Sequence, residues 1–97
     1  MKFVIIDGEK MTSREAAHAH IAEALDFPAY YGKNLDALAD CLSEVPSDTA
    51  VLLHNADAAR TALGAYADDL FAVFAEISQS GGFLLVVGEA ISDEETV

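Results

Sequence analysis

The sequence predicts one α/β domain in which a small three-stranded parallel sheet packs against helices. Three apolar runs of five or six residues have the length of strands, and longer stretches with helical spacing of apolar residues separate them. Because strands joined by helices need crossover connections, we expect the strands to be parallel. Of the 97 residues, 53% are hydrophobic, which is enough for a core with helices on one face of the sheet. We assign this domain to residues 1–88 and expect an acidic, flexible tail at residues 89–97.

The first predicted strand is the nearly continuous apolar run at residues 2–7, which we expect to be buried on both faces. Thr12 and Glu15 have the spacing of a capping box, so the first helix is predicted to begin at Thr12. This helix is expected to end before Pro28, because proline disfavours the helical conformation in the residue that precedes it. Its inner face is predicted to consist of Ala17, Ile21, Ala24 and Leu25.

Two histidines, His18 and His20, lie on this predicted helix. Residues two apart on a helix point in different directions, so the pair is not expected to share a metal ion. His18 lies beside the apolar stripe and is predicted to be a hydrogen-bonded packing residue. The sequence contains no phosphate-binding loop and no cluster of metal ligands, so we expect neither a cofactor nor a metal.

The second predicted strand is the apolar run at residues 50–54, and a short helix through Leu63 follows it. Asn55 and Asp57 are alternative N-caps for that helix. Gly64 is expected to divide it from the next helix, and a single kinked helix is the alternative.

A longer helix is predicted at residues 66–79, where apolar residues recur at positions typical of one buried helix face. The two glycines at 81–82 are expected to end it, because glycine adopts a left-handed conformation without strain. The apolar run at residues 83–87 is the third predicted strand.

The chain carries five basic and seventeen acidic residues, which give a formal charge of −12. A charge of this sign and size repels nucleic acids and anionic membranes, so we expect the chain to bind neither. The same charge would accelerate the encounter with a basic protein. Solubility is a second explanation of the charge, and both explanations can hold at once.

Cys41 is the single cysteine, so no disulfide can form within the chain, and we expect its thiol to be a small buried filler. The chain has no stretch that resembles a signal peptide and no apolar run of about 18 residues. We therefore expect a cytoplasmic protein.

The clearest functional signal is a turn that is followed at once by a helix. Pro28 and Gly32 bracket a turn that contains the adjacent tyrosines Tyr30 and Tyr31. Asn34 precedes the helical spacing and is predicted to be the N-cap, because its side chain can accept a hydrogen bond from a free backbone amide.

The predicted helix separates apolar from acidic residues. Its apolar face, which must be buried, consists of Leu35, Leu38 and Leu42. The opposite face consists of Asp36, Asp40 and Ser43, with Glu44 at its edge. No lysine or arginine within the helix neutralises the two aspartates, and like charges at this spacing cost roughly 0.3 kcal/mol. Rigid tyrosines beside such carboxylates indicate a surface for a cationic partner, and a solvated acidic face with half-buried tyrosines is the alternative.

At this turn and helix the chain resembles the barstar-like inhibitors of bacterial ribonucleases. The residues that carry the resemblance are Pro28, Tyr30, Tyr31, Gly32, Asn34, Leu35, Asp36, Ala37, Leu38, Asp40, Cys41 and Leu42. A run of this length is more specific than a short motif, and a weaker resemblance extends over residues 4–87. The resemblance implies the same α/β fold, with a three-stranded parallel sheet packed against helices.

The resemblance also implies an intracellular inhibitor that plugs the active site of a secreted, basic ribonuclease with its acidic helix and the preceding loop. A ribonuclease needs cationic side chains where the substrate phosphates bind, and a rigid carboxylate can replace the phosphate charge there. By this resemblance Asp40 would face the catalytic cations, and Asp36 would contact main-chain donors or a cation. Tyr30 would stack over the catalytic histidine, and Asn34 and Leu35 would contact a surface loop of the nuclease.

Three positions depart from the family pattern. Ala39 stands where the type member has a tryptophan, so a large contact is missing, and Glu44 replaces a glycine and adds charge at the rim. Phe83 occupies the position of a second cysteine.

Ser43 stands where the family often has threonine, and Glu76 in the last helix matches a peripheral acidic contact. The changes at Ala39 and Glu44 leave the identity of the target open.

We predict a partner-binding surface and no catalytic residue. The predicted partner-binding residues are Tyr30, Tyr31, Gly32, Asn34, Leu35, Asp36, Ala39, Asp40, Ser43, Glu44 and Glu76. One alternative is an enzyme with Asp36 and Asp40 as an acid–base or metal pair, but catalytic carboxylates need a dry pocket or partners on separate elements. One exposed helix face supplies neither, so we expect no enzyme. A second alternative is a barstar-like binding module for a basic partner that is not a nuclease.

Overall fold

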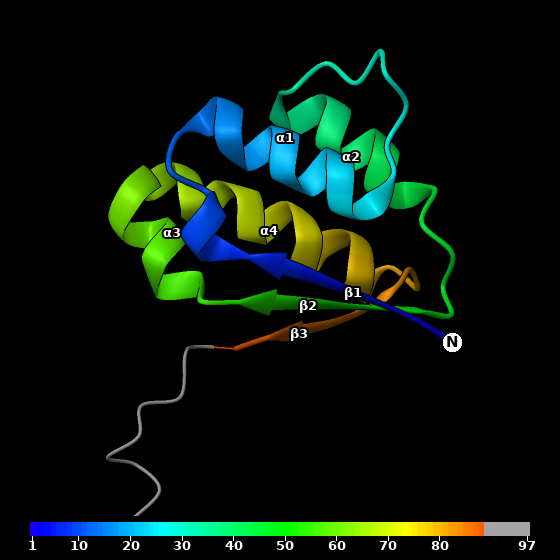
Figure 1. The fold of residues 1–97 in the computed structure, drawn as a ribbon. Helices are drawn as coiled ribbons and strands as arrows, with labels where there is room; N and C mark the ends of the chain where they lie inside the picture. The colour runs from blue at the N-terminus through cyan, green and yellow to red at the C-terminus, as the bar shows by residue number, and fades with distance from the viewer. Residues whose placement is uncertain (89–97) are drawn as a thin grey trace, which may run out of the picture.

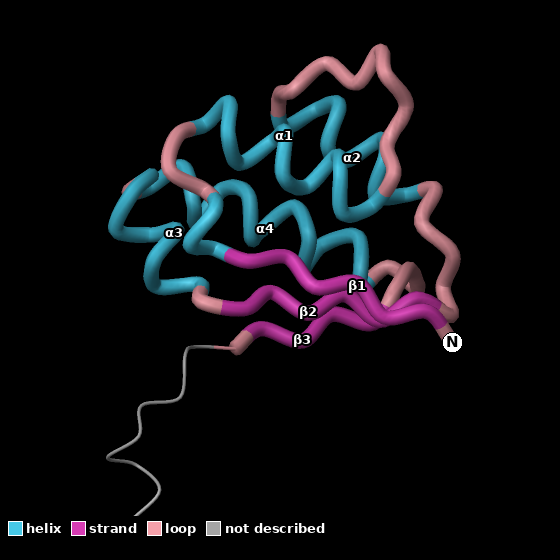
Figure 2. The backbone as a smooth tube through the Cα atoms, viewed as in Figure 1, coloured by secondary structure: helices cyan, strands magenta, loops and turns pink. Residues whose placement is uncertain are grey.

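The computed structural model describes residues 1–88, and within them it confirms the predicted α/β fold (Figure 1). Three strands form one parallel sheet: β1 (Lys2–Asp7), the central β2 (Thr49–His54) and β3 (Leu84–Val87). The helices lie on one side of this sheet (Figure 2). The acidic tail expected at residues 89–97 lies outside the described residues.

The face of the sheet that meets the helices carries the buried strand residues. Val4 and Ile6 of β1 are 6% and 0% exposed, and Val51 and Leu53 of β2 are buried with them. Phe3, which alternates with these residues along β1, is 77% exposed. The expectation that the first strand is buried on both faces was therefore wrong. Successive side chains of a strand point to opposite faces, and the helices cover only one of the two.

The connection between β1 and the first helix shifts the predicted helix start. A short 3₁₀ helix, η1 (Gly8–Lys10), follows β1, and α1 runs over Arg14–Leu25. The N-cap of α1 is Ser13, whose Oγ accepts a hydrogen bond from the backbone amide of Ala16 at 3.0 Å. The predicted capping box was wrong by one residue, because the 3₁₀ turn leaves Thr12 ahead of the cap.

Two further helices connect β2 to β3. α3 (Ala56–Leu63) and α4 (Ala65–Gln79) are separated at Gly64, as predicted, where φ is 60° and favours glycine. Asn55 occupies the N-cap position of α3, but its side chain does not cap that helix. Its Nδ2 instead donates a hydrogen bond to Oδ1 of Asp7 at 3.0 Å, which ties the end of β2 to the end of β1.

The core lies between the sheet and the helices. α2 (Leu35–Ser43) packs against α4. Its residues Leu38 and Leu42 are fully buried, as predicted. Phe74 of α4 is also fully buried, and its ring meets that of Phe83, just before β3, with centroids 6.1 Å apart. This packing places α2 on the helix side of the molecule, and the loop that leads into it lies far from the sheet (Figure 1).

Candidate protein-binding surface

The loop between α1 and α2 is shaped by local hydrogen bonds at its end. Asn34 is the N-cap of α2, as predicted: its Oδ1 accepts a hydrogen bond from the amide of Ala37 at 2.7 Å. Its Nδ2 donates to the carbonyl oxygen of Gly32 at 3.3 Å, so the same side chain also holds the turn. Lys33, between them, has a left-handed backbone with φ of 54°, which turns the chain into the helix.

The two adjacent tyrosines of this loop point to different environments. Tyr30 is 87% exposed and Tyr31 is 8% exposed. The ring of Tyr31 packs against Phe27 with centroids 5.0 Å apart, and its hydroxyl lies 2.6 Å from Nδ1 of His18. Burial raises the pKa of the Tyr31 phenol. Tyr30 therefore has a free ring to offer to a partner, whereas Tyr31 anchors the loop to the core.

His18 joins three parts of the structure through its two ring nitrogens. It is 1% exposed, and its Nε2 lies 2.7 Å from the hydroxyl of Tyr66 on α4, while Nδ1 meets Tyr31. A neutral imidazole has one donor and one acceptor, so one tyrosine accepts a hydrogen bond from the ring and the other donates one. This confirms the prediction of a hydrogen-bonded packing histidine, and it links α1, the loop and α4.

The burial of His18 makes folding sensitive to pH. Burial, followed by the charge of Lys33, lowers the pKa of His18 below its usual 6.5. The pKa of His20 is also lowered, first by burial. The folded state disfavours the protonated form of both rings. The contribution of the two neutral histidines to stability is therefore fully present above about pH 6.5 and is lost as the pH falls. We expect the free energy of unfolding to fall below pH 6.5 by at most about 1.4 kcal/mol per pH unit for each histidine, as urea unfolding measures.

Two variants test whether His18 causes this fall in the free energy of unfolding. His18→Gln removes one titrating ring, so its stability should depend less steeply on pH between about pH 6.5 and about pH 5. His54→Gln, which removes a histidine with an exposed side chain, is the control for the loss of one histidine. Equal slopes for the two variants would contradict a role for His18.

The acidic face of α2 is exposed, as its spacing predicts. The exposed residues of this face are Asp36, Asp40, Ser43 and Glu44. Ser43 donates its hydroxyl to the carbonyl oxygen of Asp40 at 2.7 Å, so it is engaged within the helix. The ion pairs found within residues 1–88 join Arg60 to Asp57 and Asp68, and none of them involves α2. The carboxylates of α2 therefore face solvent without a cationic neighbour at ion-pair distance in the described part of the chain.

A groove of about 540 Å³ lies between the loop and the C-terminal half of α2. Four predicted partner-binding residues line it together: Tyr30, Asp40, Ser43 and Glu44. The rest of its lining includes the apolar side chains of Leu25, Phe27 and Val45. Asp26 and Lys2 line the groove as well. An exposed aromatic ring, three carboxylates and one lysine thus border a partly apolar hollow, which can receive a cationic or aromatic side chain of a partner.

The structure divides the predicted residues between this groove and its surroundings. Asn34 and Leu35 line a second hollow of about 670 Å³. Gly32, Asp36 and Ala39 lie on the loop and helix and line neither hollow. Glu76 is exposed on α4, the helix against which α2 packs, and lines neither hollow as well.

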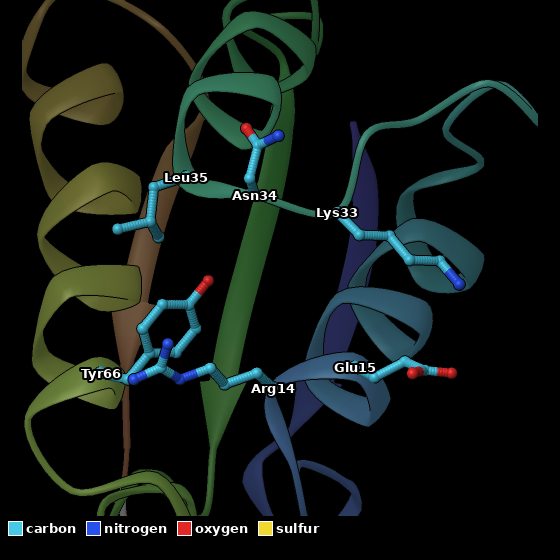
Figure 3. A pocket seen from close by; sticks show the side chains of 6 residues that line it. All are labelled: Arg14, Glu15, Lys33, Asn34, Leu35 and Tyr66. Atoms are coloured by element: carbon cyan, nitrogen blue, oxygen red, sulfur yellow. The ribbon is translucent and has the colours of Figure 1, made fainter.

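The second hollow contains residues that the sequence analysis missed. Arg14, Glu15 and Tyr66 complete its lining together with Lys33 (Figure 3). The guanidinium of Arg14 lies over the ring of Tyr66, 4.3 Å from its centroid, while Lys33 points away from this pair. No linear spacing connects positions 14, 33 and 66, so only the packing of α1 beside α4 could reveal this cluster.

Cys41 lies beside the acidic residues but is not activated by them. Its side chain is half-buried and its thiol is free. Burial, followed by the charges of Glu44 and Asp40, raises the pKa of this thiol. The thiolate is the nucleophilic form of cysteine, and this environment disfavours it.

Within residues 1–88, no group of three or more histidine, cysteine or acidic side chains is arranged to hold a metal ion. None of the helices in this part of the chain has the length and apolar character needed to cross a bilayer.

Comparisons with known proteins show which family the chain resembles. A family model described as "Barstar (barnase inhibitor)" matches residues 1–91. The chain is also similar to a Bacillus subtilis (strain 168) protein named "Putative ribonuclease inhibitor YrdF", with 42% identity over 80 residues. This match covers 81% of the present chain and 88% of that protein. The family is one of inhibitors and not of enzymes, which confirms the expectation that this chain is not an enzyme. The chain belongs to the barstar family.

Proposed function

We propose that this chain inhibits a secreted, basic ribonuclease by inserting the acidic face of α2 and the preceding loop into its active site. The observation that carries the proposal is the groove that the exposed Tyr30 lines together with Asp40 and Glu44. The membership of the chain in the barstar family supports a ribonuclease as the partner. Synthesis in the cytoplasm would let the inhibitor protect the cell before the nuclease is exported.

The proposed mechanism replaces substrate phosphates with carboxylates. The active site of a ribonuclease is cationic, and carboxylates accept charge-assisted hydrogen bonds from arginine, lysine and protonated histidine. Asp40 would accept such bonds at the centre of the interface, while Asp36 would meet main-chain donors or a further cation. Tyr30 would stack over the catalytic histidine, and Glu76 would make a peripheral contact from α4.

The loop would add contacts around this centre. Asn34 and Leu35 would meet a surface loop of the nuclease, with Gly32 permitting close approach. Ser43 and Glu44 would lie at the rim beside Asp40. Tyr31 is buried, so it would act by holding the loop in place.

Rigidity supports tight binding by this surface. The Asn34 cap and the hydrogen bond between Tyr31 and His18 hold the loop before any partner arrives. Because little conformational freedom remains to be lost at these residues, more of the contact energy appears as affinity.

A titration of small basic ribonucleases with the purified chain tests the proposal. Stoichiometric loss of RNA cleavage is the expected result. Binding without inhibition would favour the alternative, a barstar-like module for a basic partner that is not a nuclease. The half-buried Ala39 and the exposed Glu44, which depart from the family pattern, are the features that favour this alternative. The absence of binding to every basic ribonuclease would contradict the proposal.

Association with the nuclease is expected to slow as salt rises. A charge of −12 attracts a basic partner over roughly a Debye length, about 10 Å at 0.1 M salt and about 3 Å at 1 M. We expect the association rate constant to fall at least about tenfold between 0.05 and 0.5 M NaCl, with a smaller change in the dissociation rate. Stopped-flow fluorescence measures both rates. An association rate that is indifferent to salt would exclude electrostatic capture.

A further inference from the structure

Within residues 1–88, no helix covers the face of the sheet that points away from the helices (Figures 1 and 2). The large exposed side chains on this face are apolar. We call this surface the open face and define it by its large exposed side chains: Phe3 (77% exposed), Ile5 (61%), Leu84 (53%), Val86 (46%) and Leu52 (37%). The strand register makes them contiguous. Ala50 of β2 pairs with Phe3 and with Leu84, and Leu52 pairs with Ile5 and with Val86. The open face is therefore a two-row apolar patch that crosses all three strands.

An uncovered face of this kind is unusual for a parallel sheet. Parallel sheets occur almost only with both faces covered, and contiguous exposed apolar patches of a few hundred Å² mark interaction sites. Leaving the five side chains in water forgoes hydrophobic stabilisation of about 25 cal/mol for each Å² that could be buried. A second layer on the open face would recover part of it.

The distribution of charge indicates which molecule would cover the open face. Asp7 and His54 lie at the carboxyl ends of β1 and β2, at the border of the open face. The other acidic residues of the described chain lie on helices or in the connections outside the strands. A basic nuclease is therefore attracted to the helix side of the molecule and not to the open face. A second copy, in contrast, offers an identical uncharged patch and keeps its acidic helices on the outside.

The segment at residues 89–97 is a poorer candidate to cover this surface. Four of its nine residues are acidic, and its large apolar residues are Ile91 and Val97. The five side chains that define the open face include no cation to pair with those carboxylates. Burying these carboxylates on an apolar sheet would cost more free energy than burying the two aliphatic side chains would contribute.

We infer that the chain forms a symmetric homodimer in which the open faces of two copies pack against each other. The exposed area of the five side chains is roughly 550 Å² per copy, so these side chains could contribute at most about 1,100 Å² to the contact, close to the lower limit of about 1,000 Å² for a specific interface. The dimer is therefore weak. In this arrangement each α2 faces outward, so one dimer can bind two nuclease molecules.

Salt distinguishes this contact from nuclease binding. Each copy has a formal charge of −12, so two copies repel each other, and screening by salt strengthens their apolar contact. The dimer dissociation constant should fall as NaCl rises from 0.05 to 0.5 M, while affinity for a basic nuclease falls over the same range. Failure of either inference can therefore be recognised without reference to the other.

Sedimentation equilibrium of the full chain from about 5 µM to about 500 µM measures the dimer directly. We expect the mass to rise from that of a monomer towards that of a dimer, at lower concentration in high salt. Phe3→Lys and Leu84→Lys place a charge in the contact and should each raise the dissociation constant at least about tenfold. Ala19→Lys is the matched control, because it adds the same charge at an exposed position of α1 and should dimerise at least as well as the unaltered chain.

Three results would overturn the inference. The first is a full chain that stays monomeric over the whole concentration range in 0.5 M NaCl. The second is dimerisation of both open-face variants with the affinity of the Ala19→Lys control, provided that circular dichroism shows all three folded. The third is dimerisation only after removal of residues 89–97, which would show that this segment covers the open face instead. Unchanged nuclease inhibition by Phe3→Lys and Leu84→Lys would support the outward position of α2.

Discussion

Asp40→Asn is expected to weaken inhibition of the target ribonuclease at least about 100-fold while leaving the fold intact. Asp40 is exposed on α2 and lines the same groove as Tyr30. In the proposed complex its carboxylate is taken out of water and compensated by cations of the nuclease. Removing one member of such a pair leaves the other buried and uncompensated, which costs roughly 3–5 kcal/mol, and 3 kcal/mol corresponds to about 150-fold. Inhibition constants from RNA cleavage assays measure the effect.

A second charge substitution separates this local role from the overall field. Asp69→Asn removes one negative charge from an exposed position near the N-terminal end of α4 and should change the inhibition constant by no more than about threefold. Both variants have the same net charge, so long-range attraction to a basic partner is equal in the two. If Asp40→Asn inhibited as well as Asp69→Asn, the assignment of Asp40 to the centre of the interface would fail.

Phe74→Ala is expected to lower the free energy of unfolding by about 3–5 kcal/mol. The side chain is 0% exposed, it meets Phe83 edge to face, and it lies on the helix that supports α2. Truncation removes buried apolar area and leaves a cavity that the surrounding helices fill only in part. Urea or thermal unfolding measures the loss, and it is a large fraction of the roughly 5–15 kcal/mol that stabilises a small domain.

The same chemical change on the open face provides the control. Phe3→Ala removes a phenyl ring from a side chain that is 77% exposed, so its cost in the monomer should be below about 1 kcal/mol. The comparison requires a protein concentration of about 1 µM or less, because dimerisation would add concentration-dependent stability. Similar costs for the two variants would mean that Phe3 is buried within the monomer, which would contradict the one-sided sheet.

Much of the candidate surface was predictable because its signals are local. The cap at Asn34, the buried Leu38 and Leu42, and the exposed Asp36 and Asp40 all follow from helical spacing within one short segment. The roles of Tyr30 and Tyr31 were not predictable in this way. Two adjacent tyrosines have the same propensity to be buried. Tyr31 is the buried one because its hydroxyl bonds to His18, which lies on α1.

The N-terminal strand shows the same limit. Its run of apolar residues is the pattern of a strand that is buried on both sides, yet Phe3 and Ile5 are exposed. Whether a strand face is covered depends on where the crossover helices lie, and that is a property of the whole chain. In the inferred dimer, the second copy would cover Phe3 and Ile5, so both faces of this strand would then be buried.

By itself, the sequence determined the α/β class, the order of its elements, the acidic helix and the large negative charge, because spacing and composition act along the chain. Tertiary structure alone decided which tyrosine is exposed, which residues join Asp40 in a groove, and which face of the sheet the helices of residues 1–88 leave uncovered. Each of these depends on contacts between segments far apart in sequence, where the geometry of packing decides the outcome and local propensity does not.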